Sequence, residues 1–451
     1  MRPVAAGFVA VLCYRLVAAA YGRRIGSATG IAVVLGTGVG FWAAVPKRHA
    51  LTAALALLAA FWLYRSRALA DDGTGGTGGI SDVGHADVRY RAGAYACVGV
   101  TAWVAAPEGA ILGLAVAAAD LATARRGDLE PRALLVVGVV TVVAFLPFVA
   151  TNLAIAADPL QPPRRLPPYD GSMADGGGER GGQAGAGSGG SFGAVTVAGT
   201  VLGRFVRGAT VAVTRPDQVF ATFVRTGYTT NARSGVEAIL GANLSLLEST
   251  PLFGALLGTV AVGSRRLADR LEGSASPSAP AIRVVDAFAV AYAVLLSLAY
   301  IPRLPIHATI TVRYLVPMYP LLGYAVVRIP AIRRAIEHRG AWGAWTYAGT
   351  VLVGGQALFA MLALQESAVG ESMQTHAVIN LGLATLLAAW VVAATLAPRN
   401  GDSDRSDPSH YDTAGAVLLG LAAGAGTVLV LLASVAYFPT GGFLLPVVPA
   451  L

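Results

Sequence analysis

The stretch Ala133–Ala157, A-L-L-V-V-G-V-V-T-V-V-A-F-L-P-F-V-A-T-N-L-A-I-A-A, contains no charged residue over its 25 positions. A helix that crosses a membrane needs about 20 consecutive, predominantly apolar residues, because the hydrocarbon core is about 30 Å thick. The stretch therefore predicts a membrane span. Working outward from it, similar apolar windows recur on both sides, and they predict an all-α integral membrane protein.

The composition of the whole chain agrees with that expectation. The chain has 451 residues, of which 55% are hydrophobic and 13% are charged, whereas soluble domains carry about 25% charged residues. Mean hydropathy is +0.62. Cys13 and Cys97 each lie within an apolar run, so we expect neither a disulfide nor a metal site from them. We expect membrane lipids as partners and no nucleic acid.

The apolar windows predict about 10–12 transmembrane helices, and interfacial helices in a long outer loop. They divide the chain into an N-terminal transmembrane bundle (1–157), an extracytoplasmic Pro/Gly-rich loop (158–235) and a C-terminal transmembrane bundle (236–451). The windows are Val4–Ala20, Ile25–Val45, Ala50–Tyr64, Ala92–Ala105, Gly109–Ala124, Ala133–Ala157, Pro251–Val262, Val284–Ile301, Ile310–Val327, Trp342–Leu364, Ala377–Leu396 and Ala414–Phe438.

The long loop has three parts. Asp158–Asp170 is stiffened by prolines, and Gly171–Ser191 is glycine-rich, which predicts disorder. The regions Val195–Val206 and Val219–Val224 alternate apolar residues with arginines. This pattern predicts helices in the plane of the membrane interface, either as surface anchors or with a role in binding substrate.

Arginine clusters indicate the orientation. They collect in short loops, and with these spans the loops fall on one side, which is the cytoplasmic side by the usual bias. Both chain termini then lie outside the cell membrane. The opposite face still carries cations, at Lys47-Arg48 and at Arg303–Arg313. An anionic ligand on the outer face explains these cations better than codon usage does.

The strongest site candidate lies in Ile306–Pro320, I-H-A-T-I-T-V-R-Y-L-V-P-M-Y-P. The sequence places Arg313 and Tyr314 about two turns inside a predicted span. A mid-bilayer arginine costs at least a few kcal/mol, so we expect it to pair or to face water. Arg313 therefore either has a functional role or forms a structural ion pair within the bundle. Pro317 and Pro320 should bend the helix, so the segment predicts the wall of a polar cavity.

Two further residues at the outer membrane edge, His49 and Glu108, each allow a structural and a functional interpretation. His49 follows Lys47-Arg48, and it is either a solvated side chain or a phosphate contact or base. Glu108 follows Pro107 at a predicted helix start, where the helix dipole stabilises a carboxylate without any function. Glu108 is otherwise a base or a ligand of a divalent cation. The sequence has no phosphate-binding glycine loop and no recognised metal motif.

The segment Arg313–Pro320, R-Y-L-V-P-M-Y-P, resembles the polytopic glycosyltransferases of the GT-C superfamily, which include protein O-mannosyltransferases and aminoarabinose transferases. The stretch Asn152–Leu160, N-L-A-I-A-A-D-P-L, is similar to the same group. Leu246–Leu252, L-L-E-S-T-P-L, is similar to archaeal members. The resemblance covers Phe41–Pro330.

The resemblance implies transfer of a sugar from an isoprenoid-phosphate donor to an acceptor protein or glycan at the outer face. A carboxylate activates the acceptor hydroxyl, and arginines, sometimes with a divalent cation, stabilise the departing phosphate. Glu108 would be the catalytic acidic residue. The substrate-binding residues would be Arg313, Tyr314, His307, Arg303, His49, Arg48 and Lys47.

The chain departs from the family at its start. Such enzymes begin with one span and an outer loop that bears the key aspartate, whereas the first aspartate here, Asp71, falls on the predicted cytoplasmic side. We therefore expect a misplaced start, a fragment or a non-catalytic relative. The alternatives are a transporter or flippase for an amphipathic anion, which would favour two related halves, and a membrane component without a ligand.

Overall fold

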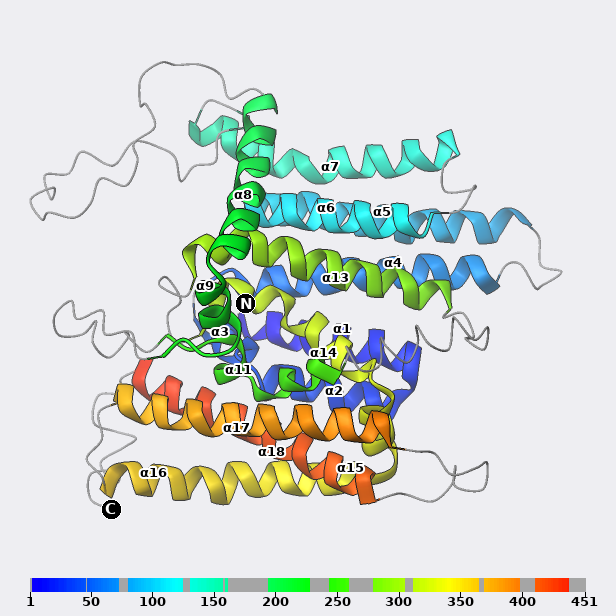
Figure 1. The fold of residues 1–451 in the computed structure, drawn as a ribbon. Coiled ribbons are helices and arrows are strands. Elements are labelled where there is room, and N and C mark those ends of the chain that lie inside the picture. Colours follow the sequence, from blue (N-terminus) through cyan, green and yellow to red (C-terminus); the bar gives the residue numbers. More distant parts are fainter. Residues whose placement is uncertain are drawn as a thin grey trace, which may run out of the picture.

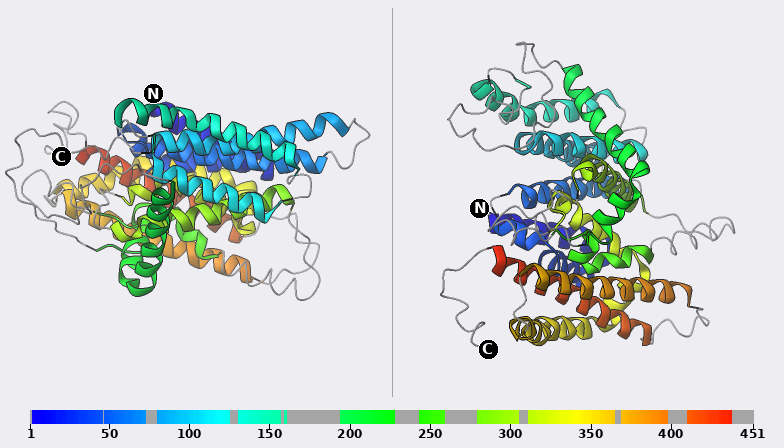
Figure 2. Two further views of the ribbon diagram at one scale, coloured as in Figure 1. Left: turned by 90° about the horizontal axis from the view of Figure 1, so that it is seen from above. Right: turned by 60° about the vertical axis from the view of Figure 1, so that its left-hand side comes forward.

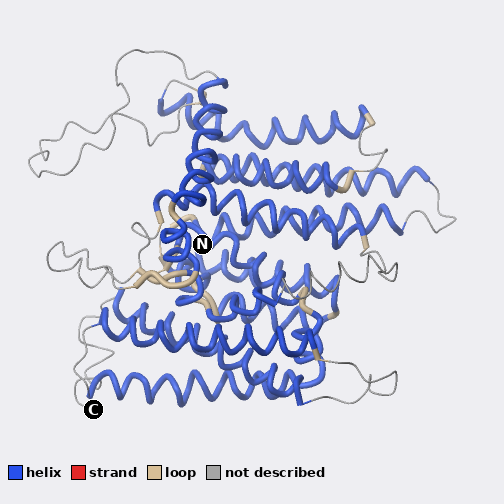
Figure 3. Tube along the Cα trace, in the orientation of Figure 1, coloured by secondary structure: helices blue, strands red, loops and turns tan. Residues whose placement is uncertain are grey.

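The computed structural model describes residues 2–45, 47–72, 80–124, 130–156, 159–160, 194–227, 243–258, 279–304, 311–364, 369–397 and 410–437. These residues form helices and connecting turns and contain no strand (Figure 3). The predicted all-α fold class is therefore confirmed for the part of the chain that the structure describes.

The first seven helices lie between Arg2 and Ala156. Gly22, with φ of 91°, occupies the left-handed region that glycine tolerates best and joins the first two helices. The helices are α1 (Arg2–Tyr21), α2 (Arg23–Leu35), α3 (Val39–Ala44), α4 (His49–Asp72), α5 (Ile80–Val104), α6 (Ala106–Ala122) and α7 (Pro131–Ala156).

The rest of the chain begins with two helices of the long loop and continues into a second set of helices. The elements are α8 (Ala194–Thr214), α9 (Pro216–Phe223), α11 (Leu246–Ser249), η3 (Pro251–Leu257), α13 (Pro280–Tyr300), η4 (Ile301–Arg303), η5 (Arg313–Met318), α14 (Tyr319–Val327), α15 (Pro330–Gly349), η6 (Thr350–Gly354), α16 (Gly355–Leu364), α17 (Val369–Leu396) and α18 (His410–Tyr437).

The long helices lie side by side, and α8 crosses them (Figures 1 and 2). We call the end where α4 and α6 begin and α13 ends the site end, and the opposite end the arginine end. α8 packs closely on α13, because a Cβ added to Gly208 would lie 1.8 Å from the Leu298 carbonyl oxygen. The long-loop regions predicted as helices are thus helical, while Gly171–Ser191 lies outside the described residues.

Five of the described helices are long and apolar enough to cross a membrane. A sixth span results if Arg313–Val327 and Pro330–Met361, which are bent by 81° relative to each other, count as one. Only 11% of the span in α7 is buried, and Leu135 and Val142 are among its exposed side chains. A continuous apolar surface of this kind is what a lipid-facing helix presents. The multi-pass membrane class predicted from sequence is supported.

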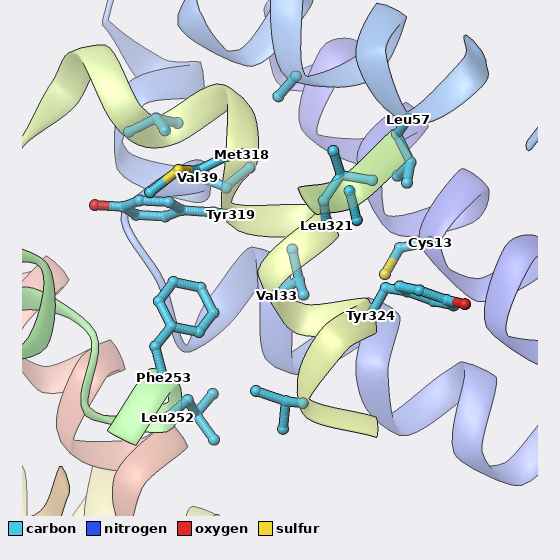
Figure 4. Close-up of a cluster of buried hydrophobic side chains, with 14 of the residues drawn as sticks. Cys13, Val33, Val39, Leu57, Leu252, Phe253, Met318, Tyr319, Leu321 and Tyr324 are labelled. Carbon is cyan, nitrogen blue, oxygen red and sulfur yellow. The ribbon is translucent and has the colours of Figure 1, made fainter. Parts of the chain in front are cut away.

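A buried cluster around α14 joins helices from both ends of the chain (Figure 4). The Tyr319 ring meets Phe253 edge to face at 5.3 Å, and Val39 and Met318 belong to the same cluster. Elements of both predicted bundles therefore share one core.

The start of the α14 segment differs from the prediction. Arg313 opens the short 3-10 helix η5 and is half-buried, so it does not lie two turns inside a regular helix. The physical reason is local. Pro317 lacks a backbone N–H and lies inside η5, and Pro320 lies in the first turn of α14, where proline is tolerated. The regular helix therefore begins only at Tyr319.

Candidate functional site at one end of the bundle

Glu108 lies at the tight connection between α5 and α6. Ala105 is extended, with φ of −160° and ψ of 96°, and α6 begins directly after it with Pro107 in its first turn. A Cβ on Gly109 would lie 2.5 Å from the Cα of Ala102, so glycine allows the two helices to approach closely. This packing leaves the Glu108 residue only 2% exposed.

One carboxylate oxygen of Glu108 receives three hydrogen bonds. Arg48 donates to Oε1 from Nη2 at 2.9 Å and from Nε at 3.2 Å. The Tyr300 hydroxyl donates to the same oxygen at 2.7 Å. The other oxygen, Oε2, is buried and has no hydrogen-bond partner among the described residues. A buried carboxylate oxygen without a partner is costly, and it is a natural acceptor for a ligand's donor group.

Aromatic rings connect this ion pair to Arg313. Tyr300 stacks on Tyr314 with ring centroids 4.9 Å apart, and the Arg313 guanidinium carbon lies 5.2 Å from the centroid of the Tyr314 ring. Arg313 also lies 6.0 Å from the ring of Trp42. Such distances are in the range of cation–π attraction. Glu108 and Arg313 are therefore parts of one contiguous cluster.

His49 completes the cluster and is neutral. Its ring meets Trp42 and Tyr314 edge to face, with centroids 5.7 Å and 5.8 Å away. His49 precedes the predicted span Ala50–Tyr64. Burial, and then the charges of Arg48, Arg313 and Lys47, lower the pKa of its imidazole to about 3. A neutral imidazole can accept a hydrogen bond from a ligand at pH 7, but so low a pKa makes His49 a weak base.

Arg48 is held in its charged form. Burial alone would lower the pKa of its guanidinium, but the neighbouring Glu108 carboxylate outweighs that effect, and the net result is a raised pKa. The side chain of Arg48 is 22% exposed, compared with 3% for Glu108. The arginine therefore faces the outside of the pair while the carboxylate is enclosed.

The structure brings together five of the eight residues predicted for the site. They are Arg48, His49, Glu108, Arg313 and Tyr314. Lys47 and Arg303 are exposed, and His307 lies outside the described residues.

Sequence reasoning missed two members, Tyr300 and Trp42. The signal available was their type, because tyrosine and tryptophan gather at membrane interfaces. Trp42 also donates from Nε1 to the Thr311 hydroxyl at 2.9 Å, and this bond ties α3 to the segment that carries Arg313. The cluster is therefore assembled from four separate parts of the chain.

An apolar cleft of about 310 Å³ adjoins the cluster. It lies among α5, α6, α7, α8 and α13, and its lining contains residues next to both Glu108 and Tyr300. Lining residues include Pro107, Phe145, Phe148, Arg204, Phe205 and Ala299. The cleft is mostly apolar, with Arg204 as a cation in its wall, so it suits an alkyl or isoprenoid chain.

The residues of the cluster do not fit a divalent cation. No group of three metal-ligating side chains gathers among the described residues. Glu108 is the acidic member of the cluster, and one of its two oxygens already receives two hydrogen bonds from the Arg48 cation. Hard cations prefer several oxygen ligands. We therefore derive no metal-dependent step.

The arginine end holds separate buried networks. Asp120 receives hydrogen bonds from Arg67 at 2.8 Å, from Arg91 at 2.8 Å and from Tyr95 at 3.0 Å. Both arginines of this network are buried. These arginines were predicted only as markers of the cytoplasmic side, and the acidic partner within a predicted span was missed. Asp286 similarly pairs with Arg328 at 2.7 Å.

No protein family, curated protein or solved structure matches this chain. The functional interpretation therefore depends on the geometry of the site.

Proposed function

We propose that the protein is a multi-pass membrane protein with about 10–12 transmembrane helices whose site end faces outward, and that it acts as a glycosyltransferase of the GT-C type. Its substrate would be a sugar carried on an isoprenoid phosphate, with a protein or glycan as acceptor. The observation that carries the proposal is the buried, unpaired Oε2 of Glu108, which lies in one cluster with the cation of Arg313.

The proposed chemistry uses the two ends of this cluster. The acceptor hydroxyl attacks the anomeric carbon of the sugar while the bond from that carbon to the phosphate oxygen breaks. The hydroxyl proton passes to Oε2 of Glu108, which acts as general base. The phosphate leaves with the bonding electron pair, and Arg313 neutralises its charge.

The neighbouring features have supporting roles in the proposal. Tyr300 and Arg48 orient the carboxylate through Oε1, so that Oε2 remains free for the acceptor. The apolar cleft beside Pro107 would take the first part of the isoprenoid chain. α8 would lie at the membrane interface across this entrance, because Gly208 holds it against α13.

Binding is tested first, with purified full-length protein in detergent. The probes are dolichyl phosphate, dolichol and inorganic phosphate, and the readout is the shift of the unfolding midpoint. Arg313→Gln should weaken the binding of dolichyl phosphate at least about tenfold, because an arginine hydrogen bond to a charged group contributes about 1.5–3 kcal/mol. Arg303→Gln is the matched control, since it removes an exposed cation close by in the chain. Equal weakening by both variants would refute a specific phosphate contact.

Transfer is tested with radiolabelled dolichyl phosphate mannose and crude membranes as acceptor. Glu108→Gln should lower incorporation by about 10²–10⁴, the usual contribution of a general base, while dolichyl phosphate binding persists. If binding requires Arg313 but the Glu108 variant transfers label as well as the parent protein does, the enzyme proposal fails. A carrier for the same lipid then replaces it.

A further inference from the structure

A second apolar crevice lies away from the candidate site. It has a volume of about 270 Å³ and is enclosed by α2, α14, α15, α18 and η3. Its lining is dominated by small and aliphatic side chains. They include Ala28, Ala32, Ile336, Gly343, Leu419 and Gly420.

Two contacts of α2 bracket the crevice. Toward the site end, the Thr427 hydroxyl of α18 donates to the Leu35 carbonyl at 2.8 Å. Toward the arginine end, Arg24 donates from Nη1 to the Glu337 carbonyl of α15 at 2.6 Å. The lining residues of α2 lie between these two contacts. The crevice therefore lies between helices that hydrogen bonds hold together at both of its ends.

Water is a poor occupant of this crevice. The two lining threonines, Thr29 and Thr37, donate their hydroxyls to the carbonyls of Ile25 and Val33, each four residues back in the chain. Tyr347 shares its hydroxyl hydrogen bond with Thr427 at 3.1 Å. A buried water needs two to four polar partners, which these walls do not supply. An empty gap would forfeit dispersion contacts, so an alkyl chain from the surrounding lipid is the fitting occupant.

A cation stands where that chain would leave the crevice. Arg24 is exposed, and a Cβ added to the lining residue Gly340 would lie 3.7 Å from its Nε. Arginine carries five N–H donors in a fork that matches phosphate, and the contact with Glu337 uses one of its terminal nitrogens. Arg339 lies next to Gly340 on α15, at the same end.

We propose that this crevice binds one acyl chain of an anionic phospholipid whose phosphate is held by Arg24. The site is distinct from the one at the site end, because its lining shares no residue with the cluster around Glu108 and Arg313. Its ligand is a structural lipid from the leaflet at the arginine end, whereas the ligand at the site end would be a reacting substrate.

The experiment is native mass spectrometry of the purified full-length protein, titrated with phosphatidylglycerol and phosphatidylcholine of identical chains. One bound phosphatidylglycerol is expected, with about fivefold preference over phosphatidylcholine. That ratio corresponds to about 1 kcal/mol for one cation near an anionic headgroup. Glycerol phosphate should not compete, because it lacks the chain.

Three variants make the test specific. Arg24→Gln should remove the headgroup preference, while Arg23→Gln, which loses the same charge from the exposed neighbouring position, should keep it. Ala28→Leu fills the crevice and should weaken the binding of both lipids at least fivefold. Ala32→Leu, one turn further along α2, is a second variant that fills the crevice. Unchanged lipid binding in both filling variants, or equal loss of preference in the two arginine variants, would overturn the proposal.

Discussion

Removing either partner of the ion pair between Arg48 and Glu108 should destabilise the protein, but loss of the arginine should cost more than loss of the carboxylate. The perturbation is Arg48→Met, which removes the cation and retains an apolar stem of similar length. Glu108 then stays enclosed at 3% side-chain exposure, with a charge and one hydrogen bond from Tyr300. Removing one partner of a buried pair costs about 3–5 kcal/mol, because an uncompensated charge remains. We expect about 3 kcal/mol, since Arg48 is partly exposed and solvent already screens the pair.

The reverse substitution should cost less. Glu108→Gln leaves an arginine whose side chain is 22% exposed and whose long stem can carry the charge to water. We expect a loss of about 1.5 kcal/mol, the lower end of the contribution of a hydrogen bond to a charged group. The double variant, Arg48→Met with Glu108→Gln, should lie within about 1 kcal/mol of the parent protein, because no unpaired charge is left.

The assay is unfolding in mixed micelles with increasing dodecyl sulfate, followed by near-ultraviolet circular dichroism. The four proteins of the cycle are measured at pH 7 and one salt concentration. The reasoning is refuted if Glu108→Gln costs as much as Arg48→Met, or if the double variant is the least stable of the four. Either result would mean that the carboxylate is as well solvated as the arginine.

Two other predictions concern His49 and α8. Because the folded-state pKa of His49 is lowered to about 3, from an ordinary value near 6.5, the unfolded chain binds the proton first as the pH falls. Stability should therefore drop between pH 6.5 and pH 4, by at most about 1.4 kcal/mol per pH unit, and His49→Gln should remove this part of the slope in unfolding midpoints. Gly208→Val should detach α8 from α13, since a Cβ there meets a carbonyl oxygen at 1.8 Å, and limited proteolysis should then cleave α8. Gly203→Val, on the same helix with nothing within 4 Å, should leave the digestion pattern unchanged; cleavage in both variants would contradict the contact.

The fold class and most of the candidate site could be predicted from the sequence. Apolar windows identify helices because length and polarity are local properties. Arg313 is predictable because an arginine inside a predicted span has few low-energy environments, and Glu108 because it follows Pro107 at a predicted helix start. What joins them was not predictable, because Tyr300 and Tyr314 stack through the meeting of two helices that are separate in sequence.

The arginine end shows the limit of charge counting. A loop arginine indicates orientation by its type alone, but Arg67 is fully buried beside Asp120. Its partner lies 53 positions away, and only the packing of α4 on α6 brings the two side chains together. Asp120 within an apolar window was the available signal, since acidic residues inside spans are rare and pair with other groups.

Helix α6 has an ion pair at each end, one to Arg48, which directly precedes α4, and one to Arg67 in α4. Arg48 and Arg67 are 19 positions apart (67 − 48), whereas Glu108 and Asp120 are 12 positions apart (120 − 108). At 1.5 Å per residue these separations are about 28 Å and about 18 Å. The two ion pairs are therefore closer together on α6 than on the α4 side. Sliding or pivoting of α6 would strain at least one of the two pairs. Glu108 is therefore held in place, and we expect movement caused by a ligand in the segment that carries Arg313.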